Sequence, residues 1–316
     1  MINTDVLIVG GGPAGSSCAW MLRKSGVNCV ILDKADFPRQ KPCAGWITPE
    51  VFKALQISPE EYPKSLTRFS SFQVSLFGFS FRFPTKQYAV RRWEFDTWLL
   101  ERSDVEIIKH QVDHITQKDD LFIIDGVYAG KVLVGAGGTH CPVLRTFFDR
   151  QFSSRKSGLI IAREEEFTYS IVDNRCHLWF FENGFPGYSW YVPKTGGYLN
   201  VGIGGNGKKL KARGETLKQH WDRLVAKLSE SGLVNDHEFN PLGYTYFLHQ
   251  QSKKAHLENV YLAGDALGLA TRDMGEGIRP AIISGLLAAN AIISRKEYTL
   301  ESIPKFSFPS LLRQRK

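Results

Sequence analysis

A glycine-rich segment near the start of the chain has the residue types and spacing to hold a phosphate group. GGGPAG at residues 10–15 follows a short apolar run and precedes an expected helix and a second apolar run ending at Asp33. In such a strand–turn–helix–strand unit, Gly10 permits a tight turn, Gly12 lets the backbone approach a pyrophosphate, and Gly15 allows close helix–strand packing. The helix start offers N–H groups to phosphates, and Asp33 can accept from a ribose hydroxyl. The unit therefore predicts a site for an ADP-containing dinucleotide.

Other chemistries have little support in the composition. The five cysteines include no Cys-x-x-Cys pair, and no histidine cluster has metal-ligand spacing, so we expect a reducing compartment and no metal site. Lys and Arg total 40 against 32 Asp and Glu, a formal charge of +8 that favours anionic partners. No RNA- or DNA-binding motif accompanies this charge, so nucleic acid is not an expected partner.

The sequence contains no recognisable targeting or membrane-spanning segment. Its start lacks the basic region and cleavage site of a signal peptide, and the longest apolar stretch, residues 281–293, is too short and interrupted to span a bilayer. We therefore expect a cytoplasmic protein. The basic end (Arg313, Arg315 and Lys316) allows at most a peripheral contact with the inner membrane surface.

The expected elements divide the chain into a discontinuous nucleotide-binding domain and an inserted β-rich domain. Residues 69–83 alternate in polarity as a half-buried strand pair does. Further expected elements are a helix at 92–102, strands at 105–109, 123–127, 131–134 and 260–263, a β-rich section at 157–247 with one helix at 214–231, and a helix from Ile278. The nucleotide-binding domain then comprises residues 1–60, 84–152 and 253–316, and the β-rich domain comprises residues 61–83 and 153–252.

Three separated motifs resemble those of FAD-dependent enzymes with the para-hydroxybenzoate hydroxylase fold. They are GGGPAG, then GAGGTHCPVLR at 135–145 and GDALGLATRDMGEGI at 264–278. The resemblance implies an α/β fold, in which a Rossmann-type FAD-binding domain carries an inserted antiparallel β-sheet substrate domain. It also implies that Asp265 bonds to the ribityl chain and that the turn from Gly275 to Ile278 places N–H groups at the flavin pyrimidine edge. A helix N-terminus there would stabilise the negative charge of a reduced flavin.

The same resemblance extends to other cofactor contacts. Residues 92–96 match the fold's Arg-x-x-Phe-Asp motif, whose Arg, here Arg92, lies near the cofactor, and Val112 lies where the backbone holds adenine. Arg39 and Lys41 are expected near the pyrophosphate or in a solvated loop. The residues expected to bind the cofactor are Gly10, Gly12, Pro13, Ala14, Gly15, Asp33, Lys34, Arg39, Cys43, Ala44, Arg92, Val112, Ala136, Gly137, Asp265, Gly275, Gly277 and Ile278.

Two further segments resemble the geranylgeranyl reductase family. KPCAG at 41–45 resembles its Lys-x-Cys-(Gly/Ala)-Gly segment beside the flavin, and PGYSWYVP at 186–193 resembles its Tyr-x-Trp-x-Phe-Pro motif at the prenyl-binding site, with Val192 in place of Phe. The resemblance makes Cys43, Tyr188 and Trp190 the expected catalytic residues. Cys43 could tune the flavin or help protonate a substrate carbon, or it could be a small buried hydrophobe.

Tyr188 and Trp190 stand two apart on an expected strand and therefore face the same side. They could line a long apolar substrate channel, with Tyr188 as a proton source, or they could be ordinary sheet packing.

The resemblance implies an FAD-dependent oxidoreductase that reduces C=C bonds of a polyprenyl lipid by hydride transfer from reduced flavin. No second GxGxxG follows a strand, so the electron donor is either NAD(P)H binding transiently or a ferredoxin-like protein. Gly137 replaces the Asp that hydroxylases of this fold use in handling FAD and NAD(P)H, which disfavours a nicotinamide donor.

Two alternatives stay open. Residues 188–193 are close to the halogenase motif Trp-x-Trp-x-Ile-Pro, with Tyr188 in place of the first Trp, so a flavin-dependent monooxygenase or halogenase is one. The other is a flavin-binding carrier without catalytic activity.

Overall fold

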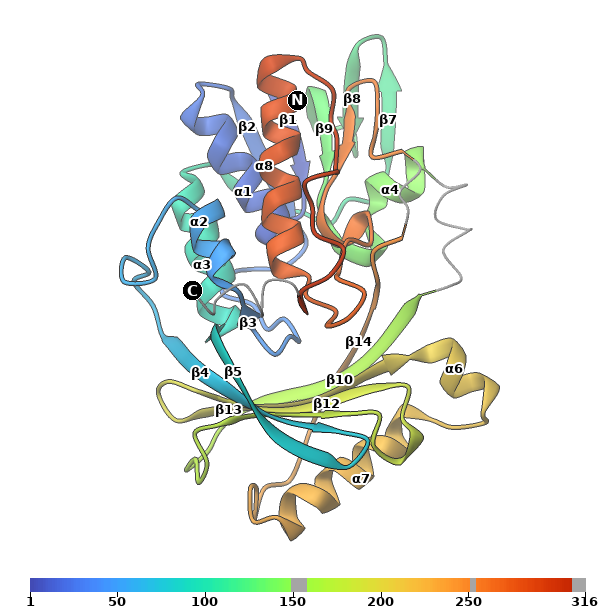
Figure 1. The fold of residues 1–316 in the computed structure, drawn as a ribbon. Helices are drawn as coiled ribbons and strands as arrows, with labels where there is room; N and C mark the ends of the chain where they lie inside the picture. The colour runs from blue at the N-terminus through green and yellow to red at the C-terminus, as the bar shows by residue number, and fades with distance from the viewer. Residues whose placement is uncertain (149–157, 251–253, 309–316) are drawn as a thin grey trace.

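A mostly parallel sheet forms the first of two layered units in the computed structural model, which describes residues 1–148, 158–250 and 254–308 (Figure 1). Its central strand β1 (Ile2–Val9) pairs in parallel with β2 (Cys29–Asp33) and β9 (Tyr128–Gly135). The strand order is β15-β16-β9-β1-β2-β6, and β7 and β8 extend it from β9. The remaining bounds are β6 (Ile107–Lys109), β7 (Ile115–Lys118), β8 (Leu121–Ile124), β15 (His256–Leu257) and β16 (Val260–Leu262).

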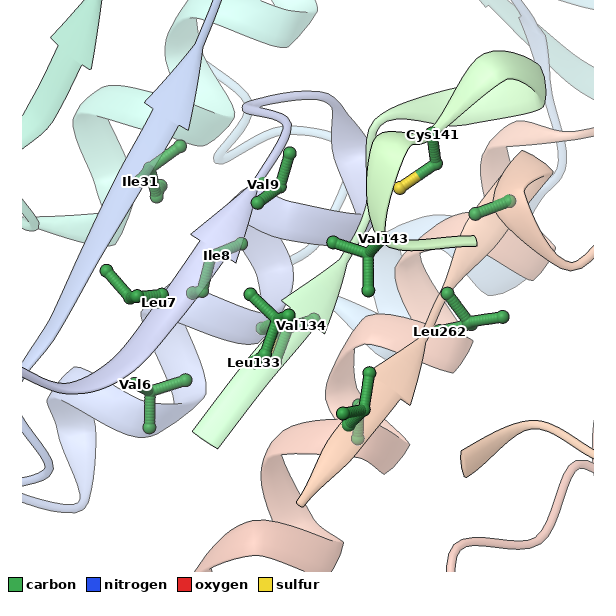
Figure 2. Packing of buried hydrophobic residues seen from close by; sticks show 14 of the residues in the cluster. Val6, Leu7, Ile8, Val9, Ile31, Leu133, Val134, Cys141, Val143 and Leu262 are labelled. Atoms are coloured by element: carbon green, nitrogen blue, oxygen red, sulfur yellow. The ribbon is translucent and has the colours of Figure 1, made fainter. Parts of the chain in front are cut away.

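Helices cover this sheet because its central strands are apolar on both faces. Figure 2 shows Val6 to Val9 packed among side chains of neighbouring strands, with Val143 of α4 (Pro142–Phe147) beside them. Helix α1 (Pro13–Lys24) packs against α3 (Arg92–Ser103) and α8 (Ile278–Ser294). A Cβ on Gly285 would lie 2.1 Å from the Ala14 carbonyl oxygen, so glycine permits the close approach of α8 to α1.

The second sheet lies across the carboxyl end of the first unit and is mostly antiparallel (Figure 1). Its strand order is β14-β10-β13-β12-β11-β4-β5-β3, with only β4 and β11 parallel among its described pairs. The bounds are β3 (Trp46–Ile47), β4 (Leu66–Leu76), β5 (Phe79–Val90), β10 (Leu159–Thr168), β11 (Cys176–Phe180), β12 (Gly187–Lys194), β13 (Tyr198–Asn206) and β14 (Leu242–Phe247).

The two faces of the second sheet have different neighbours. Helix α7 (Leu217–Glu230) covers the outer face, where its Trp221 and Leu224 join a core with Val201 and Ile203. The inner face turns toward the first unit, and Met274 of the C-terminal motif packs there with Trp190. Short helices α2 (Pro49–Ala54) and α6 (Gly207–Ala212) and single 3₁₀ turns at Gly138–His140, Glu182–Gly184 and Gly264–Ala266 complete the described elements.

The structure confirms the expected fold class and corrects several boundaries. The strand pair expected at 69–83 extends over 66–90, so an end of the β-rich domain at residue 83 would divide β5. Trp46–Ile47, expected in the nucleotide-binding domain, pairs with β5 as well. The alternation of apolar side chains weakens after Phe83, where Pro84, Lys86 and Gln87 follow, although the strand pairing continues to Val90.

Helix α6 was not expected, because only residues 214–231 of the β-rich section show a helical pattern. It begins at an Asn206 cap, whose side chain accepts from the Lys209 N–H. The boundaries at 152/153 and 252/253 and the basic residues Arg313, Arg315 and Lys316 lie outside the described residues. In the described part of the chain, no helix has the length and apolar character needed to cross a bilayer, and no group of three or more His, Cys, Asp or Glu is placed to hold a metal ion.

Candidate active site

The turn after β1 requires glycine at two positions. Gly10 has a φ of 108°, and a Cβ there would lie 2.4 Å from the Ala136 carbonyl oxygen. A Cβ on Gly15 would lie 1.9 Å from the Gly10 carbonyl oxygen. Helix α1 begins at Pro13, directly after Gly12, without a side-chain N-cap, so its first N–H groups are left for a ligand. The segment thus presents bare backbone to an anion.

Side chains around this turn have the chemistry expected of a dinucleotide site. Asp33 at the end of β2 accepts from the Gly11 N–H (2.7 Å) and the Ala35 N–H (2.9 Å), which fixes its carboxylate beside the turn. The Lys34 side chain is exposed, and the Val112 side chain is buried in the core of the first unit, whereas the contact expected of Val112 involves its backbone.

Arg39 approaches the same turn from the loop after β2. Its Nη2 lies 3.4 Å from the position of a Cβ on Gly12, and its buried Nε has no hydrogen-bond partner among the described residues. Its guanidinium also lies 3.4 Å from Asp96, which Arg92 binds through two hydrogen bonds of 2.7 Å. Although burial disfavours its charge, Asp96 raises the pKa of Arg92. A partly buried cation with a free donor fits a phosphate at this place.

The C-terminal motif gathers at the start of α8. The Asp265 Oδ1 lies 3.4 Å from the position of a Cβ on Gly277, which precedes Ile278 at the helix N-terminus without a side-chain cap. Gly275 has a φ of 63°, and a Cβ there would lie 2.3 Å from the Tyr246 hydroxyl oxygen of the second sheet. The motif therefore forms a contact between the two sheets.

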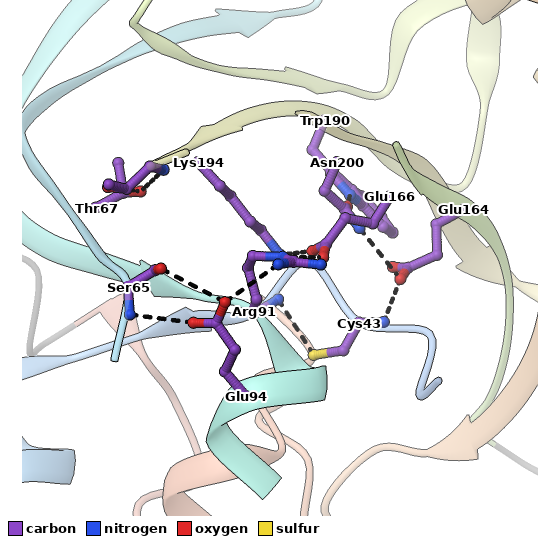
Figure 3. A network of polar contacts seen from close by, with 12 residues as sticks. Cys43, Ser65, Thr67, Arg91, Glu94, Glu164, Glu166, Trp190, Lys194 and Asn200 are labelled. Atoms are coloured by element: carbon purple, nitrogen blue, oxygen red, sulfur yellow. Dashed lines mark hydrogen bonds and ion pairs between the residues drawn. The ribbon is translucent and has the colours of Figure 1, made fainter. Parts of the chain in front are cut away.

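Cys43 connects the cofactor motifs with the second sheet (Figure 3). Its backbone N–H donates to Glu164 of β10, and its sulfur accepts from the Gly45 N–H at 3.4 Å. The Arg92 side chain lies close enough to Cys43 to interact with it electrostatically. The preceding Lys41 is close enough to Asp265 to interact with it electrostatically, and burial lowers the Lys41 pKa. The half-buried Cys43 thus lies among the residues that the sequence predicts to bind the cofactor.

A buried polar network beside Cys43 was not expected from the sequence. Glu164 is 3% exposed, its Oε1 accepts from Asn200 at 3.3 Å, and its Oε2 is buried without a hydrogen-bond partner among the described residues. Burial raises the pKa of Glu164 to about 7. The neighbouring Glu166 binds Lys194 at 2.6 Å and Arg91 at 2.8 Å, and these cations lower its pKa despite burial.

The signal for this network was present in β10. Three consecutive glutamates follow the apolar start of this strand, and a period of two places Glu164 and Glu166 on one face. Carboxylates on the inner face of a sheet need partners, so this pattern indicates a polar site.

Tyr188 and Trp190 lie on the same face of β12, as their spacing predicts, with ring centroids 5.6 Å apart. The Trp190 indole donates to the Asn200 side chain at 2.7 Å, and the Tyr188 hydroxyl donates to the Met274 carbonyl at 2.6 Å. Burial raises the pKa of Tyr188 well above its ordinary value. Because its proton is already engaged by Met274, Tyr188 is poorly placed to release it.

An apolar cavity begins at these two side chains and reaches the Cys43 loop. It is narrow, with a volume of about 20 Å³. Its lining residues are Ala44, Trp46, Phe69, Phe72, Cys176, Leu178, Tyr188, Trp190 and Val192. The inner face of the second sheet is thus polar along β10 and β13 and apolar from β12 to β5.

Comparisons with known proteins find similar chains. Residues 3–57 match the family described as FAD binding domain. An uncharacterized protein of Methanosarcina barkeri is 30% identical over 93% of this chain and 76% of its own length. Digeranylgeranylglycerophospholipid reductase 1 of Methanopyrus kandleri is 25% identical over 93% of this chain and 81% of its own.

Solved structures show the same fold. A geranylgeranyl bacteriochlorophyll reductase-like protein from Thermoplasma acidophilum superposes with a TM-score of 0.77 at 20% identity, over 93% of this chain and 80% of its own. A flavin-dependent brominase superposes with a TM-score of 0.70 at 18% identity, over 94% and 81%. Fold and site together define an FAD-dependent oxidoreductase of the para-hydroxybenzoate hydroxylase fold. Within that class, the chain belongs to the geranylgeranyl reductase-like family.

Proposed function

We propose that this protein reduces carbon–carbon double bonds of a polyprenyl lipid. The observation that carries the proposal is the apolar cavity, because it begins at Ala44, directly after Cys43, and is walled by Tyr188 and Trp190. An isoprenoid chain has no polar group to recognise, so an apolar, water-excluding cavity next to the cofactor residues is what its reduction requires. The cited reductase relatives act on lipids of this chemical class by name.

The residues divide into those that hold the cofactor and those that align the substrate. The glycine turn, Asp33 and Arg39 fit the dinucleotide part of FAD, and Asp265 and the start of α8 fit the flavin part. When bound and reduced, FAD supplies the hydride that adds to one alkene carbon. The neighbouring carbon needs a proton, and Cys43 is the proposed donor because the Tyr188 proton is engaged by Met274.

The source of electrons is also a proposal. NAD(P)H could bind transiently, or a ferredoxin-like protein could deliver electrons one at a time. The formal charge of +8 favours an acidic redox protein at the surface. We further propose a cytoplasmic location, with the lipid reached by peripheral contact.

The decisive experiment is anaerobic. The FAD-loaded protein is reduced with dithionite, separated from excess reductant, and mixed with a geranylgeranylated glycerolipid. Flavin reoxidation together with a mass gain of about 2 Da per saturated bond is the expected result. Reoxidation by oxygen alone, with a hydroxylated or halogenated product, would instead identify a monooxygenase or halogenase. A flavin that cycles between oxidation states without altering any lipid would identify a carrier.

A further inference from the structure

An apolar stripe runs along the β4–β5 hairpin on the inner face of the second sheet. Phe72, Val74 and Leu76 of β4 lie directly opposite Phe83, Phe81 and Phe79 of β5. Directly paired residues of antiparallel strands project to the same face, so these six side chains form one continuous surface.

The stripe continues onto the neighbouring strands and into the cavity. Cys176, Leu178 and Phe180 of β11 pair with the same three β4 residues, and Tyr188 and Trp190 of β12 pair with Phe180 and Leu178. Phe72, Cys176, Leu178, Tyr188 and Trp190 all line the apolar cavity. The surface that forms the cavity is therefore the surface that leads to the hairpin end.

Exposure rises steadily along this stripe. Phe72 is 2% exposed at the cavity, Leu76 is 37% exposed, and Phe79 beyond the turn is 80% exposed. Phe77 in the turn is 68% exposed and stacks on Phe181 of the β11–β12 turn, with ring centroids 5.3 Å apart. We call Leu76, Phe77, Phe79, Phe81 and Phe181 the aromatic tip. Exposed apolar groups of this size mark an interaction site more often than they occur as bare surface.

The charges around the aromatic tip are basic. Residues 66–92, which include the whole hairpin, contain no Asp or Glu. Arg213 donates to the Gly184 carbonyl beside Phe181, and it ends a run with the exposed lysines 208, 209 and 211 on α6. The nearby Glu182 is neutralised by Lys227. Aromatic side chains bordered by Lys and Arg match the interface of an anionic bilayer, where the rings enter the headgroup region and the cations meet phosphates.

We propose that the aromatic tip inserts into an anionic lipid surface and that the stripe behind it conducts the prenyl chain from the bilayer to the cavity. The proposal of a docking surface depends only on the exposed residues of the aromatic tip and the charges around them. The conducting role rests on the proposed function. In Figure 1 the β4–β5 hairpin of the second sheet runs diagonally in front of the sheet's other strands, below the first unit.

Vesicle co-sedimentation of the FAD-loaded full chain tests the docking. Vesicles of phosphatidylglycerol and phosphatidylcholine in equal parts should bind the wild type, and pure phosphatidylcholine should bind it more weakly. The Phe77→Ser/Phe79→Ser variant should bind these vesicles at least about tenfold more weakly than the wild type, because two aromatic rings are no longer transferred from water into the bilayer. Both side chains are exposed, so the fold is retained. The matched control is Val172→Ser/Val127→Ser, at residues 63% and 42% exposed away from the tip, and it should bind like the wild type.

A second readout separates docking from catalysis. The tip variant should lose reduction of a prenyl lipid embedded in vesicles while retaining reduction of a short prenyl alcohol free in solution. Vesicle binding without reduction of either substrate would reject the proposed function and the conducting role but keep the docking surface. Equal vesicle binding by the tip variant and the wild type would overturn the proposal. The proposal would also be overturned if the wild type were a dimer, the tip variant were a monomer, and the two bound vesicles equally. The aromatic tip would then bind a second copy of the chain.

Discussion

The Glu164 carboxylate accepts a hydrogen bond from the Cys43 backbone N–H, across 121 residues of sequence. This bond joins the loop that carries the cofactor motifs to the sheet that carries the cavity. The carboxylate's other oxygen is buried without a partner among the described residues, so the contact leaves Glu164 able to bind a proton.

Glu164→Gln should change how stability depends on pH. Burial raises the pKa of Glu164 to about 7, above the ordinary value of 4.5, so the folded state binds the extra proton between these values. The contribution of Glu164 to the free energy of unfolding is therefore greatest below about pH 4.5. It declines as the pH rises to about 7, where the buried carboxyl loses its proton. The variant lacks the titration and should be more stable than wild type near pH 8, by on the order of 1–3 kcal/mol. Thermal unfolding across this range measures it.

The control for that experiment is Glu165→Gln, on the opposite face of the same strand, where the carboxylate pairs with His237. It should leave the wild-type slope of stability against pH intact. A Glu164→Gln variant with the same slope as wild type would show that Glu164 does not carry the buried proton.

Cys43→Ala should separate proton delivery from flavin binding. If the thiol protonates the substrate carbon, turnover of the lipid should fall by about 10²-fold while flavin content and the rate of flavin reduction stay unchanged. Stopped-flow absorbance of the flavin, with lipid product analysed by mass spectrometry, measures the two separately. A variant with unchanged turnover would make Cys43 a packing residue and leave solvent or another group as the donor.

Gly15→Ala should abolish FAD retention. The added methyl would lie 1.9 Å from the Gly10 carbonyl oxygen, so the turn that presents N–H groups to the pyrophosphate must shift. We expect a colourless protein, less stable by about 2–4 kcal/mol. Gly126→Ala is the control: unlike Gly15, Gly126 has a positive φ, 69°, but no atom lies within 4 Å of the new Cβ. That protein should remain yellow and lose only about 1 kcal/mol. A yellow Gly15→Ala protein would contradict the assignment of the turn.

The glycine motifs were predictable because a strained or crowded turn accepts only glycine, so the residue type itself indicates the turn. Gly10, Gly15 and Gly275 all show it in the structure. The spacing of Tyr188 and Trp190 likewise fixed their common face. The partners of Cys43 were not predictable in the same way, because Glu164 and Arg92 meet it only through tertiary packing. The end of the hairpin was also missed, since the polarity pattern weakens before the strand pairing ends.

Gly202→Ala should displace Trp190 from the cavity wall. A Cβ on Gly202 would lie 2.2 Å from the Trp190 ring, and the same face of β13 offers a matched control at Gly204, where the nearest atoms lie at 3.6 Å. Overpacking should cost about 1–3 kcal/mol of stability in Gly202→Ala and little in Gly204→Ala. The displaced indole would also break its bond to Asn200, so lipid turnover should fall while flavin content stays at wild-type level. Adding Trp190→Phe to Gly202→Ala shortens the ring system and should recover part of the lost stability without restoring turnover. Unfolding in urea and single-turnover lipid reduction measure the two effects, and equal stability of the Gly202 and Gly204 variants would contradict the role of Gly202 in seating the indole.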